Sequence, residues 1–431
     1  MTRRVVVVGG GYAGITAAGR LRRKLRADVE VVLVNPHGYM TYQPLLPEVA
    51  AGTVAPGHVV VPLRSALPGV SVVRGLLQGL DLRTRTATVS SRHGDVALRY
   101  DELLLAVGGV TRTFPVPGLL EHAIGFRTVE EALHLGNRIL GQLELAAASK
   151  DQETRLRHLT FVFVGAGYAG VEALAELEDM VRREIKHYPE LDAEPLRWVL
   201  VEAGERILGQ LPERLGKYVD AQLRRRGVSV RTGTTIETMA GGRVQLSDGS
   251  TLTTDTVVWT AGVVAPPLLK RLGLPVDPAG RVRTDATLRV HGIDNLWALG
   301  DCASVPDVHS GEMCAPTAQH AVRQAVRAAD NVVAALRART PRPYRHKDAG
   351  AVASLGLGKG VAELYGVPLR GYAAWLVHRL YHGLRLPNRR RRLLVVLNWM
   401  LGSFSRDPVA MPALESPRQP LREAHEQQAV Q

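Results

Sequence analysis

The sequence predicts an α/β protein with two doubly wound parallel-sheet domains, one inserted into the other, and an amphipathic helical region towards the C-terminus. Two stretches lead to this prediction, residues 5–16 (VVVVGGGYAGIT) and residues 161–172 (FVFVGAGYAGVE). In each, a four-residue apolar run precedes a cluster of glycines and a helical pattern, as in a strand-turn-helix unit. The third observation is a pair of amphipathic segments after residue 370.

Both stretches have the G-x-G-x-x-G spacing of a dinucleotide-binding turn. The first glycine permits a tight turn, the second lets a pyrophosphate approach the backbone, and the third lets the helix pack on the strand. One copy alone also occurs in plain strand-to-helix connections, but two copies favour two Rossmann-like dinucleotide-binding domains. The defining glycines are Gly9, Gly11, Gly14, Gly165, Gly167 and Gly170.

Length and composition exclude several classes of protein. A chain of 431 residues fits two or three domains, and 45% apolar residues is ordinary for a globular protein. Arg3 and Arg4 precede only four valines, too few for a signal peptide, and no apolar run is long enough to span a bilayer. The spacing of the two cysteines, Cys302 and Cys314, predicts no disulfide, no metal site and no redox thiol pair.

The net charge of +13 is spread along the chain, which argues against a nucleic-acid partner. Denser basic runs occur at residues 20–26, 224–226 and 389–392. The first two fall on helices and are expected to be solvated. The third adjoins the amphipathic segments, where an anionic lipid surface is the favoured partner.

Acidic or amide residues follow the predicted strands at positions where a nucleotide would contact them. Asn35 ends the second strand of the first unit, where an acid is usual. The second strand of the second unit is predicted at 197–201 and ends in Glu202. An acid there binds a ribose 2′-hydroxyl and favours NADH over NADPH, although the nearby Arg206 could soften the preference. Asp301 follows the strand at 295–299, at a sheet edge where ligands bind, and a helix is expected to begin at residue 316.

Glu172 is the informative difference between the two glycine motifs, because Thr16 stands at its place in the first. We expect it on the first turn of the helix. A helix-stabilising acid is one interpretation. The other places its carboxylate between the two bound nucleotides.

Proline-rich crossings at residues 113–118 and 263–267 suggest the domain order. The first domain is predicted at 1–118 and 266–345, and the second at 119–265. Residues from about 120 to 150 are predicted to be helical. Residues 346–405 form the C-terminal region, and residues 406–431 are predicted to be a mobile tail.

Two apolar stripes with helical spacing mark the C-terminal region. One has His378, Arg379, His382 and Arg385 on the opposite side, and the other has Asn398 there. Packing on a core is the usual role of such stripes, but the Arg389–Arg392 cluster, Trp375 and Trp399 favour a helix pair on the membrane surface. His378 and His382 are expected on a polar helix face rather than at a metal. The stripe residues are Tyr372, Ala373, Leu376, Val377, Leu380 and Leu384, then Leu393, Val396, Leu397, Met400, Leu401 and Phe404.

The chain resembles the type II NADH:quinone oxidoreductases of the two-dinucleotide flavoprotein superfamily over residues 4–405. Besides the glycine motifs, the resemblance rests on Thr260–Gly262 and Gly300–Asp301. More specific to the family are residues 43–50 (QPLLPEVA), 318–321 (AQHA), 353–359 (ASLGLGK) and 393–399 (LLVVLNW). The resemblance implies a non-covalent FAD in the first domain, NADH in the second, and a quinone near the flavin on the membrane side.

The resemblance also implies roles for single residues. Asp301 matches the acid at the FAD ribityl chain, Glu172 the acid near nicotinamide and flavin, and Glu202 the ribose acid. Gln319 matches a glutamine at the quinone headgroup and Lys359 a lysine beside it. Further candidate cofactor contacts are Asn35, which departs from the family's acid, Gln43 and Gly262.

The hypothesis is therefore an FAD-dependent NADH dehydrogenase that reduces a membrane quinone without pumping protons, peripheral on the cytoplasmic face of the cell membrane. Glu172, Gln319 and Lys359 would tune the reaction and relay protons. A reductase of a soluble carrier such as ferredoxin or rubredoxin, and a redox-sensing flavoprotein, remain as alternatives. A homodimer is also left open.

Overall fold

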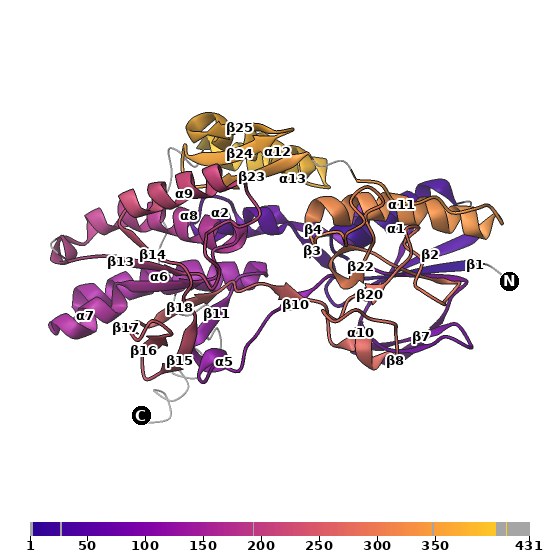
Figure 1. Ribbon diagram of the computed structural model, residues 1–431, viewed down its shortest axis with the longest axis horizontal. Coiled ribbons are helices and arrows are strands. Elements are labelled where there is room, and N and C mark those ends of the chain that lie inside the picture. The colour runs from indigo at the N-terminus through magenta and orange to yellow at the C-terminus, as the bar shows by residue number, and fades with distance from the viewer. Residues whose placement is uncertain (1–2, 26–27, 193, 347–348, 402–410, 412–431) are drawn as a thin grey trace, which may run out of the picture. The chain divides into compact units, whose positions relative to one another are not determined.

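The computed structural model describes residues 3–25, 28–192, 194–346, 349–401 and 411 (Figure 1). These residues cluster into two compact units. Unit 1 is drawn from Met1–Thr41, Val60–Arg112 and Val263–Asp348, and unit 2 from Tyr42–Val59, Thr113–Gly262 and Ala349–Gln431. By contact, residues 42–59 and the C-terminal region belong to unit 2, whereas the sequence-based division placed residues 42–59 in the first domain. The assignment of a nucleotide to each domain stays a prediction.

Unit 1 is built on a five-stranded parallel sheet in the order β21-β9-β1-β2-β5. Its central strand is buried on both sides, which explains the run of valines at residues 5–8. Helices α1 (Tyr12–Lys24) and α11 (Ala318–Leu336) pack together, and Arg20 pairs with Asp330 at 2.7 Å. The strands are β1 (Arg3–Val8), β2 (Val29–Asn35), β5 (Ser71–Arg74), β9 (Glu102–Leu105) and β21 (Leu296–Ala298).

Smaller elements complete unit 1. A three-stranded antiparallel sheet is formed by β6 (Leu76–Asp81), β7 (Thr86–Ser91) and β8 (Gly94–Arg99). β10 (Val110–Thr111), which precedes the first predicted crossing, pairs with β19 (Val263–Val264), which lies within the second. The rest are β3 (Tyr39–Thr41), β4 (Val60–Pro62), α4 (Leu63–Ala66), α10 (Leu268–Arg271), β20 (Val282–Arg283), η4 (Gly300–Cys302) and β22 (Ala303–Ser304).

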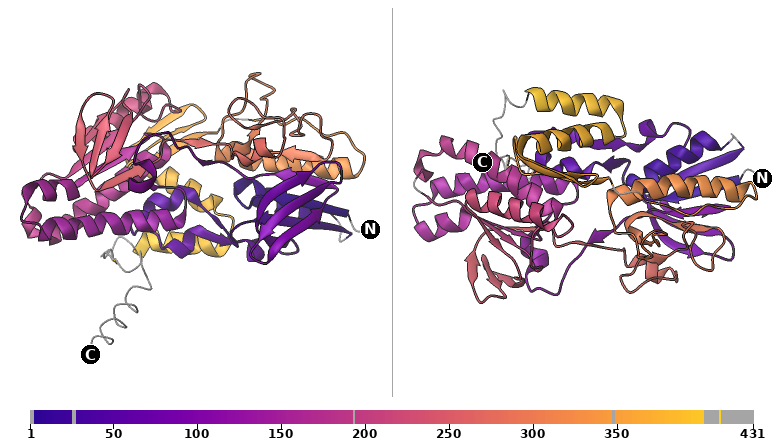
Figure 2. Two further views of the ribbon diagram at one scale, coloured as in Figure 1. Left: turned by 90° about the horizontal axis from the view of Figure 1, so that it is seen from below. Right: turned by 45° about the horizontal axis from the view of Figure 1, so that its top comes forward.

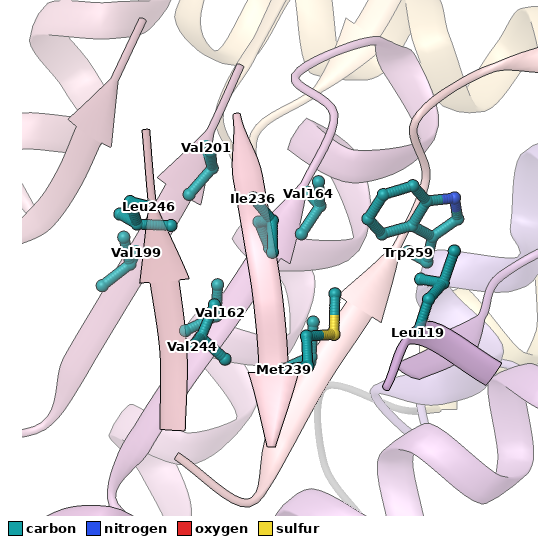
Figure 3. Packing of buried hydrophobic residues seen from close by; sticks show 11 residues of the cluster. Leu119, Val162, Val164, Val199, Val201, Ile236, Met239, Val244, Leu246 and Trp259 are labelled. Atoms are coloured by element: carbon teal, nitrogen blue, oxygen red, sulfur yellow. The ribbon is translucent and has the colours of Figure 1, made fainter. Parts of the chain in front are cut away.

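Unit 2 repeats the parallel sheet, in the order β11-β18-β12-β13-β14. A second sheet, the antiparallel β15-β16-β17, supplies Ile236, Met239, Val244 and Leu246 to a buried apolar cluster with side chains of the parallel sheet (Figure 3). The strands are β11 (Ala123–Gly125), β12 (Thr160–Val164), β13 (Arg197–Val201), β14 (Val228–Arg231), β15 (Ile236–Ala240), β16 (Arg243–Leu246), β17 (Thr251–Thr253) and β18 (Thr256–Trp259).

The helices of unit 2 come from distant parts of the chain. α2 (Leu46–Ala50) packs against α6 (Val129–Ala148) and α8 (Tyr168–Glu184), which is why residues 42–59 cluster here. α6 begins with a capping box between Thr128 and Glu131. The others are η1 (Gln43–Leu45), α3 (Pro56–Val59), α5 (Leu119–His122), α7 (Gln152–His158), η2 (Ile185–His187), η3 (Pro189–Leu191) and α9 (Glu213–Arg225).

The C-terminal part of unit 2 is a three-stranded antiparallel sheet followed by two helices. The strands are β23 (Gly350–Ser354), β24 (Gly360–Leu364) and β25 (Val367–Arg370). α12 (Gly371–Arg385) packs on this sheet, and α13 (Arg389–Leu401) lies beside α12 (Figure 2). Within the described ranges, no helix has the length and apolarity needed to cross a membrane. Phe404 and nearly all of the predicted tail lie outside those ranges.

Candidate functional site

In unit 1, the glycine turn lies where the strand order reverses, between β1 and β9. Gly9 has a φ of +105°, and a Cβ at Gly14 would lie 1.7 Å from the Gly9 carbonyl oxygen, so both positions require glycine. A Cβ at Gly11 would meet no atom within 4 Å. The turn is therefore tight on the protein side and open on the ligand side, as a pyrophosphate cradle must be.

Two polar residues predicted from the sequence lie at this edge of unit 1. The Asn35 side-chain oxygen accepts a hydrogen bond from the Gly10 N–H at 2.7 Å, while its amide donates to the His37 carbonyl. Asp301 follows β21 in η4, and the preceding Gly300 packs against Ala13 of α1. The structure thus gathers Asn35 and Asp301 around the first glycine turn.

In unit 2, the second glycine turn opens into a cavity of about 470 Å³. Gly167, Glu202 and Arg206 are among its lining residues. The Glu202 carboxylate accepts hydrogen bonds from the backbone N–H groups of Ala166 (2.6 Å) and Gly204 (2.8 Å). The cavity therefore combines backbone amides of a helix N-terminus with an acid at the end of β13, the pattern that binds a dinucleotide's pyrophosphate and ribose.

Thr260 was missed as a site residue by the sequence reasoning, although Thr260–Gly262 was recognised as a motif. Its hydroxyl lies 2.8 Å from the carbonyl oxygens of both Val164 and Gly165, so it can donate to either. A Cβ at Gly170 would come within 2.6 Å of that hydroxyl. Thr260 thus holds the second glycine turn through its hydroxyl. Gly262 follows with a φ of +100°, and a Cβ there would meet no atom within 4 Å.

Glu172 is buried, and its carboxylate points to the C-terminal part of unit 2. One oxygen accepts the Ser354 N–H at 2.8 Å and lies 3.1 Å from Nε2 of His378. The expectation that Glu172 lies on the first turn was wrong, because α8 begins at Tyr168 and no acid lies in its first turn. Since it is 7% exposed and faces β23 and α12, it is no ordinary surface helix acid.

Glu172, Glu176 and Asp179 share one face of α8, because they are four and three residues apart. Glu176 accepts from the Ser354 hydroxyl at 2.9 Å, and Asp179 from the Leu357 N–H at 2.8 Å. Burial and the neighbouring Glu48 raise the pKa of Glu176 to about 7. This acidic face of α8 therefore holds the turn that follows β23.

The segment 353–359 owes its glycines to this contact. Gly356 has a φ of +90°, and a Cβ there would lie 1.9 Å from an Asp179 carboxylate oxygen. Lys359, on the same turn, lies 3.8 Å from Asp179 and has a 48% exposed side chain. Two predicted site residues therefore meet at one face of α8: Glu172 is part of that face, and Lys359 contacts it through Asp179.

Arg226 corrects the expectation that residues 224–226 are solvated. Its side chain is about 10% exposed and pairs with Glu178 and, at 2.8 Å, with Asp179. It also donates to the Leu355 carbonyl at 2.6 Å. The buried guanidinium pairs with two carboxylates of α8 and donates to a carbonyl of the turn that follows β23, so it fixes that turn to α8.

The two histidines of α12 also differ from the sequence expectation of a polar helix face. His378 is 1% exposed and lies against Glu172. Burial alone would lower the pKa of His378, but contact with Glu172 and the charges of Glu48 and Glu176 raise it above its ordinary value. The sequence carries no signal for the contact between His378 and these carboxylates, because the residues come from distant segments of the chain.

Glu48, from the family-like segment 43–50, anchors both C-terminal helices. Its carboxylate accepts from the Trp399 indole at 2.9 Å and lies 3.8 Å from the Arg379 guanidinium. That guanidinium lies 4.1 Å from the ring centre of Trp375 and 5.0 Å from that of Trp399. Trp375 and Trp399, which in the sequence favour a helix pair on the membrane surface, are both buried.

The apolar stripes of α12 and α13 face away from this anchor. Asn398, expected opposite the second stripe, contacts Ala55 and His58. Eight stripe residues have exposures between 39% and 65%: Tyr372, Leu376, Leu380, Leu384, Leu393, Val396, Leu397 and Met400.

Gln43 and Gln319 remain to be placed. Gln43 donates from its amide to the Arg127 carbonyl at 3.0 Å in unit 2. Gln319 lies in the first turn of α11, in unit 1, and is partly exposed. Both cysteines are buried and unbonded to each other, and among the described residues no three His, Cys, Asp or Glu side chains are arranged for a metal.

Two parallel sheets, each with a dinucleotide-binding turn at its switch point, define a two-dinucleotide oxidoreductase fold. A family model described as pyridine nucleotide-disulphide oxidoreductase matches residues 3–325. The chain belongs to this family and, within it, to the type II NADH:quinone oxidoreductases.

Two relatives illustrate the second assignment. The chain is 30% identical over 417 residues to type II NADH:quinone oxidoreductase Ndh of Mycobacterium tuberculosis, which covers 93% of this chain and 88% of the relative. It is 32% identical over 406 residues to demethylphylloquinone reductase NdbB of Synechocystis sp., covering 92% of this chain and 95% of the relative.

Solved structures agree on the fold. The structure of NDH2 from Plasmodium falciparum in complex with NADH has a TM-score of 0.87 at 18% identity, covering 95% of this chain and 99% of that one. The sulfide:quinone oxidoreductase of Aquifex aeolicus has a TM-score of 0.72 at 18% identity, covering 94% and 96%.

Proposed function

We propose that this protein is an FAD-dependent NADH dehydrogenase that reduces a membrane quinone without pumping protons. The observation that carries the proposal is the pair of glycine-turn sites, one in each unit, in a chain whose relatives are named as NADH:quinone oxidoreductase and demethylphylloquinone reductase. When bound, FAD takes the hydride from NADH and passes two electrons to the quinone.

The residues that would hold FAD are those at the edge of unit 1. The backbone of the first turn would hold the pyrophosphate, Asp301 the ribityl chain, and Asn35 a ribose hydroxyl. The hydrogen bonds of the Asn35 side chain to Gly10 and His37 support this role, because they fix the orientation of its amide beside the turn. Gln43 and Gly262 are further candidate contacts.

NADH would bind in the cavity of unit 2. Its pyrophosphate would lie on the amides of the second glycine turn and its ribose on Glu202. A carboxylate repels a 2′-phosphate, so NADH is preferred over NADPH, with Arg206 reducing the preference. Glu172, Gln319 and Lys359 are the proposed residues near flavin and quinone.

We place the enzyme on the cytoplasmic face of the cell membrane, where NADH is available and a lipid-soluble quinone can be reached. Support comes from the exposed stripes of α12 and α13, which present eight apolar side chains on the side opposite the Glu48 anchor. The intervening Arg389–Arg392 run would add roughly 1 kcal/mol per residue near an anionic leaflet.

A carrier reductase is the second candidate, since ferredoxin reductase has the same fold at a TM-score of 0.67. It needs no exposed apolar stripe on α12 and α13, so the quinone reaction is favoured.

Anaerobic mixing tests the proposal directly. Purified protein is mixed first with NADH and then with a water-soluble quinone while the flavin absorbance is followed. Bleaching by NADH and recovery with quinone are expected. A protein unable to bind flavin, or reduced flavin that persists with every quinone and reoxidises with ferredoxin or rubredoxin, would overturn it.

A further inference from the structure

Another cavity of unit 2 has no role in the function proposed above. Its volume is about 350 Å³. It lies at the N-terminal ends of the parallel strands, where Ala123 of β11 pairs with Val257 of β18. The second glycine turn follows the opposite ends of the same sheet, where Val164 pairs with Trp259. Among the described residues, none lines both this cavity and the one at the glycine turn, so NADH does not account for it.

The lining of the cavity combines apolar and basic side chains. Met239 and Val244 belong to the buried apolar cluster of unit 2 (Figure 3). The lining acids are Glu121 and Asp255. The basic side chains come from α5, α6 and β16 and are His122, His134, Arg138 and Arg243. An apolar wall with a few convergent polar groups is the usual composition of a ligand site.

Arg138 lines the cavity and is partly buried, yet it has no carboxylate partner. Its Nη2 donates to the backbone carbonyl of Asp255 at 3.0 Å, and within the described ranges its guanidinium has no other hydrogen bond and no ion pair. The Asp255 carboxylate is already engaged, because Nε of Arg157 and Nδ1 of His158 each lie 3.0 Å from its Oδ2. A partly desolvated guanidinium normally pairs with a carboxylate or a phosphate, because an unpaired charge is costly away from water. Arg138 therefore has N–H groups left for an anion.

Arg243 adds a second guanidinium to the cavity. It follows the turn between β15 and β16, in which Gly241 and Gly242 have φ values of +57° and +73°, as in a two-residue hairpin turn. Arg243 is exposed, and in the part of the chain that the structure describes its side chain has no ion pair. Because Asp255 is engaged and Glu121 is exposed, the cavity carries an excess of positive charge.

We propose that this cavity binds a small organic phosphate monoester, with its phosphoryl group at Arg138 and Arg243 and its organic part against Met239 and Val244. Guanidinium forks match phosphate oxygens and form charge-assisted hydrogen bonds with them. A phosphoryl group is tetrahedral and can accept from donors on three elements, whereas a carboxylate offers two oxygens in one plane. The volume lies near the lower end of the range for ligand sites, so the ligand is small. This inference goes beyond the proposed function and does not depend on it.

The first test measures binding by calorimetry. The full-length, flavin-loaded protein is saturated with NAD⁺, so that both glycine-turn sites are filled before the probe is added. The probe is phenyl phosphate, and phthalate is the comparison, because it carries two carboxylates on the same ring. One saturable site for phenyl phosphate, with a lower Kd than for phthalate, is expected. No saturable binding, or tighter binding of phthalate, would overturn the proposal.

The second test locates the site. Arg138→Gln and Arg243→Gln each remove one guanidinium, and each should raise the Kd for phenyl phosphate by about tenfold or more, because hydrogen bonds to charged groups are the strong ones. The matched control is Arg225→Gln, which removes the same charge from an exposed arginine of α9 outside the cavity lining. It should bind as the wild type does. An equal loss in all three variants would indicate diffuse attraction and refute the site.

The two tests remain decisive if one variant is unstable or if the enzyme has another activity. Arg243 is exposed, so Arg243→Gln replaces Arg138→Gln if the latter does not fold. Calorimetry needs no turnover. A protein that binds phenyl phosphate but reduces no quinone would therefore contradict the proposed function and leave this site standing, whereas an active enzyme that does not bind phenyl phosphate would do the reverse.

Discussion

The Glu48–Trp399 hydrogen bond should control how firmly α13 is held on unit 2. The carboxylate is 2% exposed, the indole 9%, and the bond is 2.9 Å long. Trp399→Phe keeps most of the ring but removes the N–H, leaving a buried carboxylate with one donor fewer. Hydrogen bonds to charged groups contribute about 1.5–3 kcal/mol, so the opening equilibrium of α13 should rise roughly tenfold to a hundredfold.

Native-state hydrogen exchange of the α13 amides measures this opening, because it detects local detachment without global unfolding. Met400→Ala is the matched control. Its side chain is 63% exposed on the same helix, so a change within about 0.5 kcal/mol is expected. If Trp399→Phe exchanges at the wild-type rate, the anchor assigned to Glu48 is wrong.

Three further predictions concern other parts of the chain. Burial raises the pKa of Glu102 to about 7 from 4.5, although the Trp297 indole donates to it at 2.7 Å. Ionisation of Glu102 therefore costs stability as the pH rises between these values. In denaturant titrations, Glu102→Gln should raise the free energy of unfolding by up to about 3 kcal/mol at about pH 8 and leave it unchanged at about pH 4. Equal effects at the two pH values would refute this. Leu380→Glu should weaken co-sedimentation with anionic vesicles while leaving NADH oxidation by a water-soluble quinone unchanged, and undiminished sedimentation would contradict a membrane role for the stripe. Glu202→Gln should reduce the NADH-over-NADPH ratio of kcat/KM by about tenfold, equivalent to 1.4 kcal/mol; an unaltered ratio would remove Glu202 from the ribose site.

The parallel sheets could be predicted because their signals are local. The strand predicted at 197–201 is β13 to the residue, and the helix expected from residue 316 is α11, which begins at Ala318 after a Thr317 cap. The region predicted as helical from about 120 to 150 is instead divided into α5, β11 and α6. Its middle, Ala123–Gly125, pairs with β18, a contact that a local pattern does not contain.

The C-terminal helices show what periodicity leaves undecided. Up to Met400, the stripes on α12 and α13 lie where the sequence predicted them. A stripe does not say, however, which face of a helix the rest of the chain covers. Here the side with His378, Arg379 and Trp375 is buried, because its partners, Glu48 and Glu172, come from distant segments. Polar residues on an amphipathic helix are normally solvated, and only tertiary partners reverse this.

The same burial changes how the quinone and carrier alternatives should be separated. Deleting residues 371–431 removes the exposed stripes, but it also removes His378, Arg379 and Trp399, which contact the buried carboxylates of Glu48 and Glu172. Removing one side of a buried charge pair commonly costs 3–5 kcal/mol, so a truncated chain could lose all activity for reasons of stability alone. Point substitutions on the exposed stripes avoid this, because those side chains do not contact the carboxylates. A stripe variant that still reduces a soluble quinone but no longer reduces quinone in vesicles would separate membrane attachment from catalysis, which the deletion cannot do.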